Sequence, residues 1–391
     1  MHPRLADAFV SVLSPGTSLR AWRAMGVADR NAPMYQALRA HYGRVIIVSD
    51  DTAGDGAGVL GEGIEVFGVG GDAEHLVHAA HGLARTLTPG SHVVVKTDEL
   101  SAGVRAVEFA CVLEHAGVRR SLIARGGHLW SRFAAHERGA DSREARDAAV
   151  CEGSLLHEAD LVIATTRSMS LDLAWRYQLP GDSLREVPNY VLTELGGTGL
   201  DDREKGLILS AGELTPRKRF DILVRAVALL PEAVRHTSRV VIVGDGPERA
   251  NLESLARELG VKMEFAHAMP HAELLALMRR ACIYACSSEF EGHPRCVLEA
   301  MHSGAAVIVA DSPGLATVVQ NGVTGLKVIN GPEPFAHSIG ALLDDDDWRL
   351  LLGNAANRAV GAEFSFERVL TLEVEAHAAA IGRSLQRRKA A

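Results

Sequence analysis

The strongest constraint on the fold is an alternation of short apolar runs with longer stretches of helical periodicity, which runs along the chain in two successive series. A short apolar strand followed by a helix and another apolar strand is typical of a βαβ unit, whose strands lie parallel in one sheet. The pattern therefore predicts an α/β protein built from two doubly wound, Rossmann-like domains. The strands predicted for the first domain are Phe9–Leu13, Arg44–Ser49, Glu65–Val69, His92–Lys96, Ser121–Ala124 and Leu161–Ala164.

The alternation breaks near Pro188 and restarts after Thr193–Lys205, a stretch rich in Gly, Asp and Glu that we interpret as a linker. We therefore place the domains at 1–195 and 206–365, followed by a C-terminal helix that crosses back to the first domain and a basic tail over 366–391. Sheets of this kind bind ligands at the carboxyl ends of their strands, so we expect the domains to face a cleft. The strands predicted for the second domain are Leu207–Ser210, Arg239–Val243, Lys262–Phe265, Ala281–Cys286 and Ala306–Ala310.

Composition restricts the partners and the cellular compartment that we expect for the protein. The net charge of −8 over 391 residues implies no general affinity for nucleic acid. The five cysteines show no metal-ligand spacing, which favours a reducing compartment. The start has no secretory signal pattern, and no apolar run approaches the roughly 20 residues of a membrane span. We expect a cytoplasmic protein, with a weak contact of the basic tail (Arg383, Arg387, Arg388 and Lys389) to the inner face of the membrane as an alternative.

Two carboxylates, Glu291 and Glu299, are separated by seven residues in the second domain. Glu291 belongs to a loop after a predicted strand, and Glu299 to the helix that this loop opens into. A loop that leads into a first helical turn presents backbone N–H groups and a positive dipole end, which suits a phosphate, and Pro294 fits near the first helical position. Carboxylates on either side can accept hydrogen bonds from sugar hydroxyls. The alternative is a loop Glu and an exposed helix Glu without a ligand.

With its surroundings, this segment resembles the E-x7-E signature of the family-4 retaining glycosyltransferases, which have the GT-B fold. The resemblance implies that Glu299 holds the ribose of a donor nucleotide and that Glu291 contacts the donor sugar. The residues between them are then expected to line the donor site; they are Gly292, His293, Pro294, Arg295, Cys296 and Val297.

The loop after the predicted strand Leu207–Ser210 also follows the family, with one departure. Gly212 and Lys218 stand where the family holds the donor diphosphate, but Glu213 occupies the position of its arginine. We expect Lys218 to stabilise the leaving phosphate, and Arg217 or Arg219 to compensate for the reversed charge. A donor with less phosphate charge is one alternative, and solvated charges at a helix start are another.

A Gly-rich turn beginning at Gly244 resembles the family's turn near the nucleotide. It also resembles a dinucleotide-binding fingerprint, but Arg249 occupies the place of the third glycine, which argues against NAD. In the first domain, Gly16 is the candidate for a loop over the donor phosphates, with an ordinary turn as the alternative. Many family members have a histidine just after the strand that corresponds to Ser121–Ala124. In this chain Gly126 occupies that position, so Arg125 and His128 are our candidates in this region.

The resemblance implies a glycosyltransferase that moves a sugar from a nucleotide-sugar donor to a glycan, a lipid-linked glycan or a small molecule, as in polysaccharide biosynthesis. It implies retention of configuration and no requirement for a metal or other cofactor. The expected catalytic residues are Glu291, Lys218, His128 and Arg125. Two alternatives remain, a nucleotide-sugar 2-epimerase on the same scaffold and a degenerate protein that binds sugar nucleotides without turnover. The sequence does not predict the base, the sugar or the acceptor.

Overall fold

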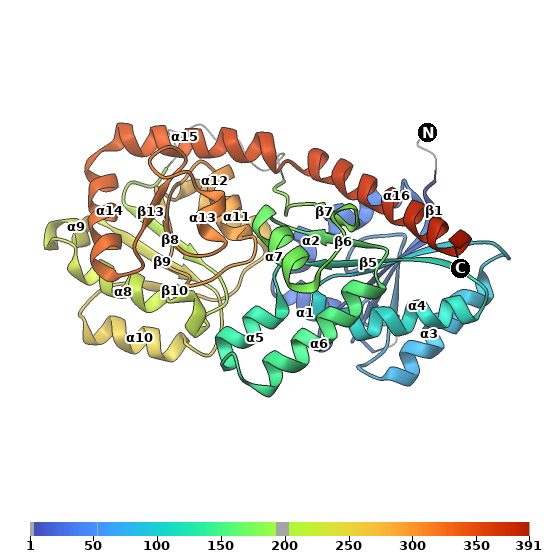
Figure 1. The fold of residues 1–391 in the computed structure, drawn as a ribbon. Coiled ribbons are helices and arrows are strands. Elements are labelled where there is room, and N and C mark those ends of the chain that lie inside the picture. Colours follow the sequence, from blue (N-terminus) through green and yellow to red (C-terminus); the bar gives the residue numbers. More distant parts are fainter. Residues whose placement is uncertain (1–3, 53, 193–202, 391) are drawn as a thin grey trace. The chain divides into compact units, whose positions relative to one another are not determined.

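The computed structural model describes residues 4–52, 54–192 and 203–390. The chain forms two compact units (Figure 1). Unit 1 comprises Met1–Pro188 and Val369–Ala391, and unit 2 comprises Asn189–Arg368. Residues 189–192 thus belong with unit 2 and not with the first domain, where we had placed them. Most of the predicted linker, residues 193–202, lies outside the described residues.

Unit 1 contains a seven-stranded parallel sheet with the order β3-β2-β1-β4-β5-β6-β7. The six predicted strands are all present, and the short strand β7 was not predicted. The strands are β1 (Ala6–Val12), β2 (Tyr42–Ser49), β3 (Ile64–Gly68), β4 (His92–Thr97), β5 (Arg119–Gly126), β6 (Leu161–Ala164) and β7 (Leu184–Glu186).

Helices cover both faces of this sheet because its central strands are apolar on both sides. In β1, Val10 and Val12 pack in the core with helices α3, α4 and α6. Alternate residues face the other way, where Phe9 stacks on His377 of α16 and Ser11 contacts Tyr35 of α2. The helices are α1 (Leu19–Ala24), α2 (Val27–Leu38), α3 (Ala73–Thr86), α4 (Gly103–His115), α5 (Trp130–Arg138), α6 (Arg143–Glu158), α7 (Arg167–Tyr177) and α16 (Phe366–Ala390).

The C-terminal helix α16 is part of unit 1 from Val369 onward. A buried ion pair joins Glu373 to Lys96 of β4, and Tyr42 Oη lies 2.8 Å from His377 Nδ1. The predicted basic tail is helical and is not a free solvated segment. Its arginines pair with acidic residues of unit 1, and these pairs are Arg383–Asp182, Arg387–Asp160 and Arg388–Glu114. Three of the four side chains on which the membrane alternative rested are therefore engaged within the unit.

Unit 2 contains a six-stranded parallel sheet with the order β10-β9-β8-β11-β12-β13. The five predicted strands are present, and the three-residue strand β13 was not predicted. Helix α8 packs with α10 and α14, whereas α12 packs with α11 and α15 (Figure 1). The strands are β8 (Leu207–Ala211), β9 (Arg239–Val243), β10 (Glu264–Ala266), β11 (Ile283–Cys286), β12 (Ala306–Ala310) and β13 (Leu326–Val328). The helices are α8 (Phe220–Leu229), α9 (Glu232–Thr237), α10 (Arg249–Glu258), α11 (His271–Arg280), α12 (Arg295–His302), α13 (Leu315–Val318), α14 (Pro332–Asp344) and α15 (Asp346–Glu363).

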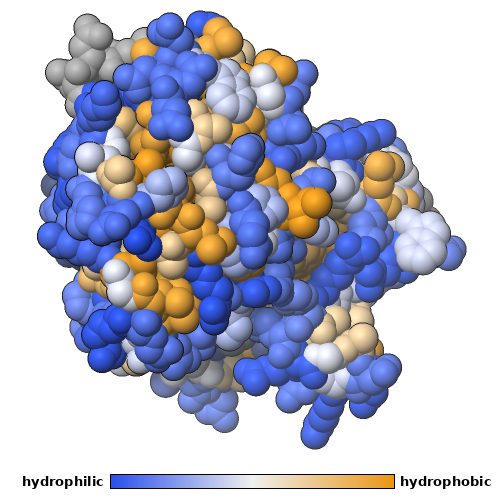
Figure 2. Space-filling model, turned by 90° about the vertical axis from the view of Figure 1, so that its left-hand side faces the viewer, coloured by the Kyte–Doolittle hydropathy of each residue, from blue (hydrophilic) through white to orange (hydrophobic). Residues whose placement is uncertain are grey.

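The surface of unit 2 carries hydrophobic groups among hydrophilic ones, as Figure 2 shows for the end that includes α8 and α14. Leu229 of α8 and Leu351 of α15 are more than half exposed. Exposed apolar residues that are interrupted in this way are usual for a folded protein and indicate no particular partner. Across the described parts of both units, no helix is both long and apolar enough to cross a membrane.

Candidate functional site

Three charged side chains predicted from the sequence meet at the carboxyl edge of the unit 2 sheet. Lys218 Nζ lies 2.6 Å from Glu291 Oε1, and an Arg217 guanidinium nitrogen lies 3.3 Å from the same oxygen. Lys218 and Arg217 follow β8, and Glu291 follows β11, the neighbouring strand. The side chains are 10% to 19% exposed, so solvent screens them less than it screens surface charges.

Backbone contacts between neighbouring loops hold Glu291 in place. Its N–H donates to Pro313 O at 2.9 Å, and the Glu289 N–H donates to Arg217 O at 3.0 Å. Gly314 has a φ of +85°, and a Cβ at this position would collide with the Glu291 carbonyl oxygen. Only glycine meets both conditions without strain. The turn at Gly314 therefore fixes the loop that carries the first carboxylate of the E-x7-E segment.

The electrostatics of this cluster favour an added anion. Burial on its own would raise the pKa of Glu291, but Lys218 and Arg217 outweigh it and lower that pKa. Burial likewise opposes the charge on Lys218, whereas Glu291 and other neighbours raise the pKa of Lys218 above its usual value. Both pKa shifts favour the charged forms of Glu291 and Lys218. Two cations share one carboxylate, which leaves a local excess of positive charge for a phosphate.

Arg219 does not belong to this cluster. It pairs with Asp221 at 3.0 Å and with Glu289 at 2.5 Å, and these partners raise its pKa. Glu213 is exposed. The ion pairs described for Arg217 and Arg219 join them to Glu291, Asp221 and Glu289. Compensation for the reversed charge of Glu213 by one of these arginines stays a prediction.

The two glycine-bearing turns predicted to lie near the nucleotide approach each other closely. The Gly212 N–H donates to Val243 O at 3.0 Å, and Gly244 follows directly with a φ of +146°. A Cβ on Gly244 would overlap the Gly212 carbonyl oxygen. Arg249 donates to Gly244 O at 2.6 Å, so its side chain braces the turn in which a dinucleotide-binding protein would have a third glycine. The glycines thus bring the loops after β8 and β9 together at the strand ends.

The segment between the two carboxylates forms the start of helix α12. Pro294 is the N-cap residue, no side chain caps this end, and the first turn has no acidic residue. These features leave the positive end of the helix dipole suited to an anion. Val297 has its side chain in the core at 1% exposure. His293 is buried, and its Nδ1 accepts from the Asn189 N–H at 2.9 Å. The side chains of Val297 and His293 therefore serve the fold, whereas Gly292, Arg295 and Cys296 are only partly buried.

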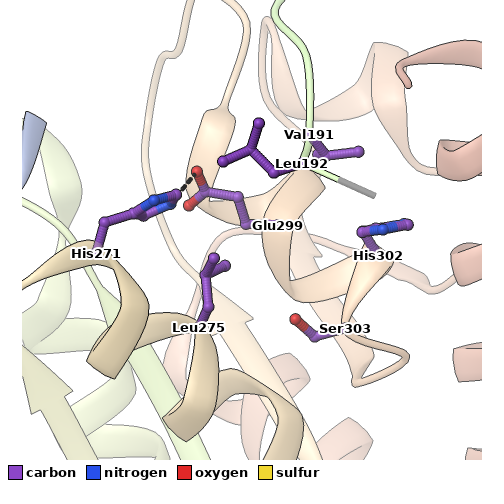
Figure 3. A pocket seen from close by; sticks show the side chains of 7 residues that line it. All are labelled: Val191, Leu192, His271, Leu275, Glu299, His302 and Ser303. Atoms are coloured by element: carbon purple, nitrogen blue, oxygen red, sulfur yellow. Dashed lines mark hydrogen bonds and ion pairs between the residues drawn. The ribbon is translucent and has the colours of Figure 1, made fainter. Parts of the chain in front are cut away.

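Glu299 is buried, with 4% of its surface exposed, so the interpretation of an exposed helix Glu is wrong. His271 Nε2 lies 2.9 Å from Glu299 Oε1, and Figure 3 shows the ring directed at the carboxylate. His271 is the first residue of α11 and was not predicted as a site residue. Both line a small pocket of unit 2, together with Val191, Leu192, Leu275, His302 and Ser303.

In unit 1, the candidate Gly16 lies in the turn after β1. Its φ is +80°, and its N–H donates to Asp50 Oδ2 at 2.6 Å. Asp50 also forms an ion pair with Arg105 at 2.7 Å, so the turn is anchored to the end of β2 through a fixed carboxylate. The positive φ explains a glycine at this position, but no contact here distinguishes a phosphate loop from an ordinary turn.

Arg125 and His128 lie at the carboxyl end of β5. The Arg125 backbone N–H donates to Thr97 Oγ1 at 2.8 Å, which ties β5 to β4. His128 Nδ1 lies 3.5 Å from Glu99 Oε2, and the same carboxylate oxygen accepts from the Gly127 N–H at 2.6 Å. Glu99 thus holds the loop that carries His128.

Asp98, beside this loop, was not predicted as a site residue. Its carboxylate accepts from Ser14 Oγ at 3.1 Å and from the Glu99 N–H at 2.7 Å. Burial, followed by the nearby charge of Glu99, raises the pKa of Asp98 to about 7. The sequence did place an acidic residue, Asp98, at the carboxyl end of a predicted strand. The burial that perturbs its pKa depends on groups distant in sequence, which the sequence pattern does not show. Raised carboxyl pKa values are common at functional sites.

Comparison with known proteins identifies the second part of the chain. Residues 199–359 match the family of glycosyl transferases group 1. This region is similar to glycosyltransferase domains. The predicted resemblance to family 4 is confirmed by curated relatives, which include D-inositol 3-phosphate glycosyltransferases. The glycosyltransferase of Corynebacterium glutamicum (strain R) is 32% identical over 236 residues, which cover 55% of this chain and 56% of the relative. The glycosyltransferase of Nocardia farcinica is 31% identical over 261 residues, which cover 62% of this chain and 57% of the relative. The chain thus matches little more than half the length of these relatives.

Solved structures extend the likeness in fold to both units of the chain. HepE of Anabaena, in complex with UDP and glucose, has a TM-score of 0.74 at 16% identity and covers 94% of this chain and 98% of its own. Sucrose-phosphate synthase of Thermosynechococcus elongatus has a TM-score of 0.75 at 18% identity with the same coverage. At such low identity the likeness concerns the fold alone, and it confirms the GT-B fold predicted from the sequence.

Proposed function

We propose that the chain is a glycosyltransferase that moves a sugar from a nucleotide-sugar donor to a hydroxyl-bearing acceptor, with retention of configuration and without a metal. The observation that carries this proposal is the meeting of Lys218, Arg217 and Glu291 beside the start of α12. In this arrangement Lys218 and Arg217 bind the donor diphosphate, while Glu291 holds Lys218 and contacts the donor sugar. Glu299, one to two turns further along α12, accepts from the ribose.

The chemistry follows from where charge develops. Breaking the bond between the sugar and the diphosphate leaves negative charge on the leaving phosphate. Preformed positive charge stabilises that transition state more than the bound substrate, and such electrostatic stabilisation is usually the largest single contribution to catalysis. Lys218 and Arg217 supply it without a metal ion. The acceptor oxygen then bonds to the anomeric carbon on the face from which the phosphate leaves, and the leaving phosphate takes the acceptor proton, so configuration is retained.

The acceptor is proposed to bind at the carboxyl edge of the unit 1 sheet. Asp98, Glu99 and His128 present acceptors and donors there, within a few residues of the ends of β4 and β5. Such groups suit a polyhydroxylated acceptor. Since the curated relatives are named for D-inositol 3-phosphate, this compound is the first acceptor to test.

The test is an assay for transfer. The purified protein is incubated with UDP-, GDP- and ADP-linked hexoses, with and without D-inositol 3-phosphate or a glycan acceptor, and products are identified by mass spectrometry. We expect a new glycoside that forms in the presence of EDTA and has the anomeric configuration of the donor sugar by NMR. Binding of the donor without transfer or hydrolysis would favour the degenerate binding protein, and conversion of the free sugar nucleotide to its 2-epimer would favour the epimerase.

A further inference from the structure

Glu299 is held by a residue that the E-x7-E pattern does not contain. His271 begins α11, and its side chain crosses to α12, where Nε2 lies 2.9 Å from Glu299 Oε1 (Figure 3). His271 is 6% exposed and Glu299 is 4% exposed. An ionised carboxylate oxygen only accepts, so in the role proposed below the hydrogen of this bond lies on the histidine nitrogen.

We propose that His271 is a positioning residue, which fixes the Glu299 carboxylate for hydrogen bonds from the ribose hydroxyls of the donor nucleotide. This inference rests on the proposed function. It assigns a role in ribose recognition to a residue outside the E-x7-E segment.

The position of His271 is itself well fixed. Pro270 precedes it as the N-cap residue, and Leu275 and Met278 of the same helix are buried at 7% and 0% exposure. Helices α11 and α12 pack against each other. The nitrogen that contacts Glu299 therefore belongs to a rigid helix. A side chain that orients another side chain must itself be held in place.

A held carboxylate binds hydroxyls better than a mobile one for two reasons. A glutamate loses rotamer freedom when it is ordered, and His271 has already imposed that order before the nucleotide arrives. A carboxylate also has about four acceptor positions, so the hydrogen bond from His271 does not by itself prevent it from accepting from ribose hydroxyls. Burial further requires that the charge be compensated, and the histidine N–H contributes to this.

An alternative role for His271 is purely structural, in which the bond to Glu299 only secures α11 against α12. The two roles differ in what they predict for ligands. A structural role affects every nucleotide equally. A positioning role affects only nucleotides that carry ribose hydroxyls.

The experiment compares one nucleoside diphosphate with its 2′,3′-dideoxy counterpart by titration calorimetry. UDP, GDP, ADP and CDP are screened first, and the tightest binder is used. We expect the unmodified protein to favour the ribose form by at least about tenfold, which corresponds to about 1.4 kcal/mol. H271A should reduce this preference to within about threefold while leaving the dideoxy affinity unchanged. H271Q should restore part of it, because its amide N–H reaches in the same direction.

A double-mutant cycle with E299Q separates action through Glu299 from any direct effect. We expect E299Q to remove most of the ribose preference and H271A to change nothing further in that background. H236A is the matched control, since His236 forms an exposed pair with Glu232 on α9 at 3.4 Å. It should leave both affinities unchanged.

Three results would overturn the inference, and the third would also overturn the proposed function on which it rests. If H271A weakens both forms equally, or neither, His271 does not act on ribose recognition. If H271A fails to fold, the same two outcomes in H271Q decide the point. If E299Q keeps the preference in a protein that transfers sugar, the function stands and this inference fails. If none of the four diphosphates binds, the proposed function itself fails.

Discussion

Lys218 and Glu291 lie 73 positions apart in the sequence, yet Lys218 Nζ and Glu291 Oε1 are 2.6 Å apart at the edge of one sheet. Their strands, β8 and β11, are neighbours in that sheet, so the loops after them converge. With Arg217, the pair forms a partly buried cluster with one excess positive charge. The first two predictions concern this cluster and its surroundings.

Lys218→Ala should lower kcat by at least about 10²-fold, because it removes a preformed charge beside the leaving phosphate. The KM for the acceptor should change far less. Steady-state kinetics with the donor identified by the transfer assay measure both. Lys262→Ala is the control, since Lys262 is exposed just before β10. A loss of only a few-fold would assign the phosphate to Arg217.

Glu213→Arg should strengthen the binding of nucleoside diphosphates by roughly 0.5–1 kcal/mol, within the range of exposed charge pairs. Glu213 is exposed, and its replacement breaks none of the ion pairs described above for Arg217 and Arg219. Calorimetry with UDP, GDP, ADP and CMP on both proteins tests this. Binding of CMP but of no diphosphate by the unmodified protein would show that the natural donor carries less phosphate charge.

Gly314→Ala should reduce both stability and turnover, because the added Cβ collides with the carbonyl oxygen of Glu291 in a backbone with positive φ. We expect a loss of about 1–3 kcal/mol in the free energy of unfolding. Gly322→Ala provides the control, since Gly322 also has a positive φ but open space around its Cα. Denaturant titrations of both variants would separate collision from backbone strain, and equal losses would show that the Glu291 loop is not held in this way.

Asp98→Asn should change how stability depends on pH. The folded protein holds the proton of Asp98 up to a pKa of about 7, against an ordinary value of 3.8. Between these values the folded state binds more protons than the unfolded state, so Asp98 makes the protein less stable as the pH rises from about 4 to about 7. The variant lacks this loss and should gain up to about 4 kcal/mol relative to the unmodified protein across that range. Parallel pH profiles of the unfolding free energy would refute the assignment.

The sequence predicted the fold well because apolar strands of parallel sheets carry a strong local signal. Among the strands that the structure describes, β7 and β13 were missed; each has only three residues, which gives a weak periodic signal. Lys218 and Glu291 were predicted as site residues because the segments around them resemble family-4 motifs, and the structure brings the two side chains together.

The rest of the site depends on contacts between distant segments. Glu299 was taken for an exposed helix residue in one interpretation, but packing of α11 on α12 buries it. His271 lies 28 positions from Glu299, and no local pattern joins the two. The raised pKa of Asp98 likewise comes from burial beneath neighbouring elements. Such environments follow from tertiary packing and not from local sequence.

The central claim is that this GT-B protein transfers sugar with the help of Lys218 and Glu291. The most direct measurement is the rate of glycoside formation, followed by mass spectrometry, for the unmodified protein, Lys218→Ala and Glu291→Gln at saturating donor and acceptor. The account predicts a product from the unmodified protein and at least about a hundredfold lower rates for both variants. Equal rates for all three proteins would contradict it.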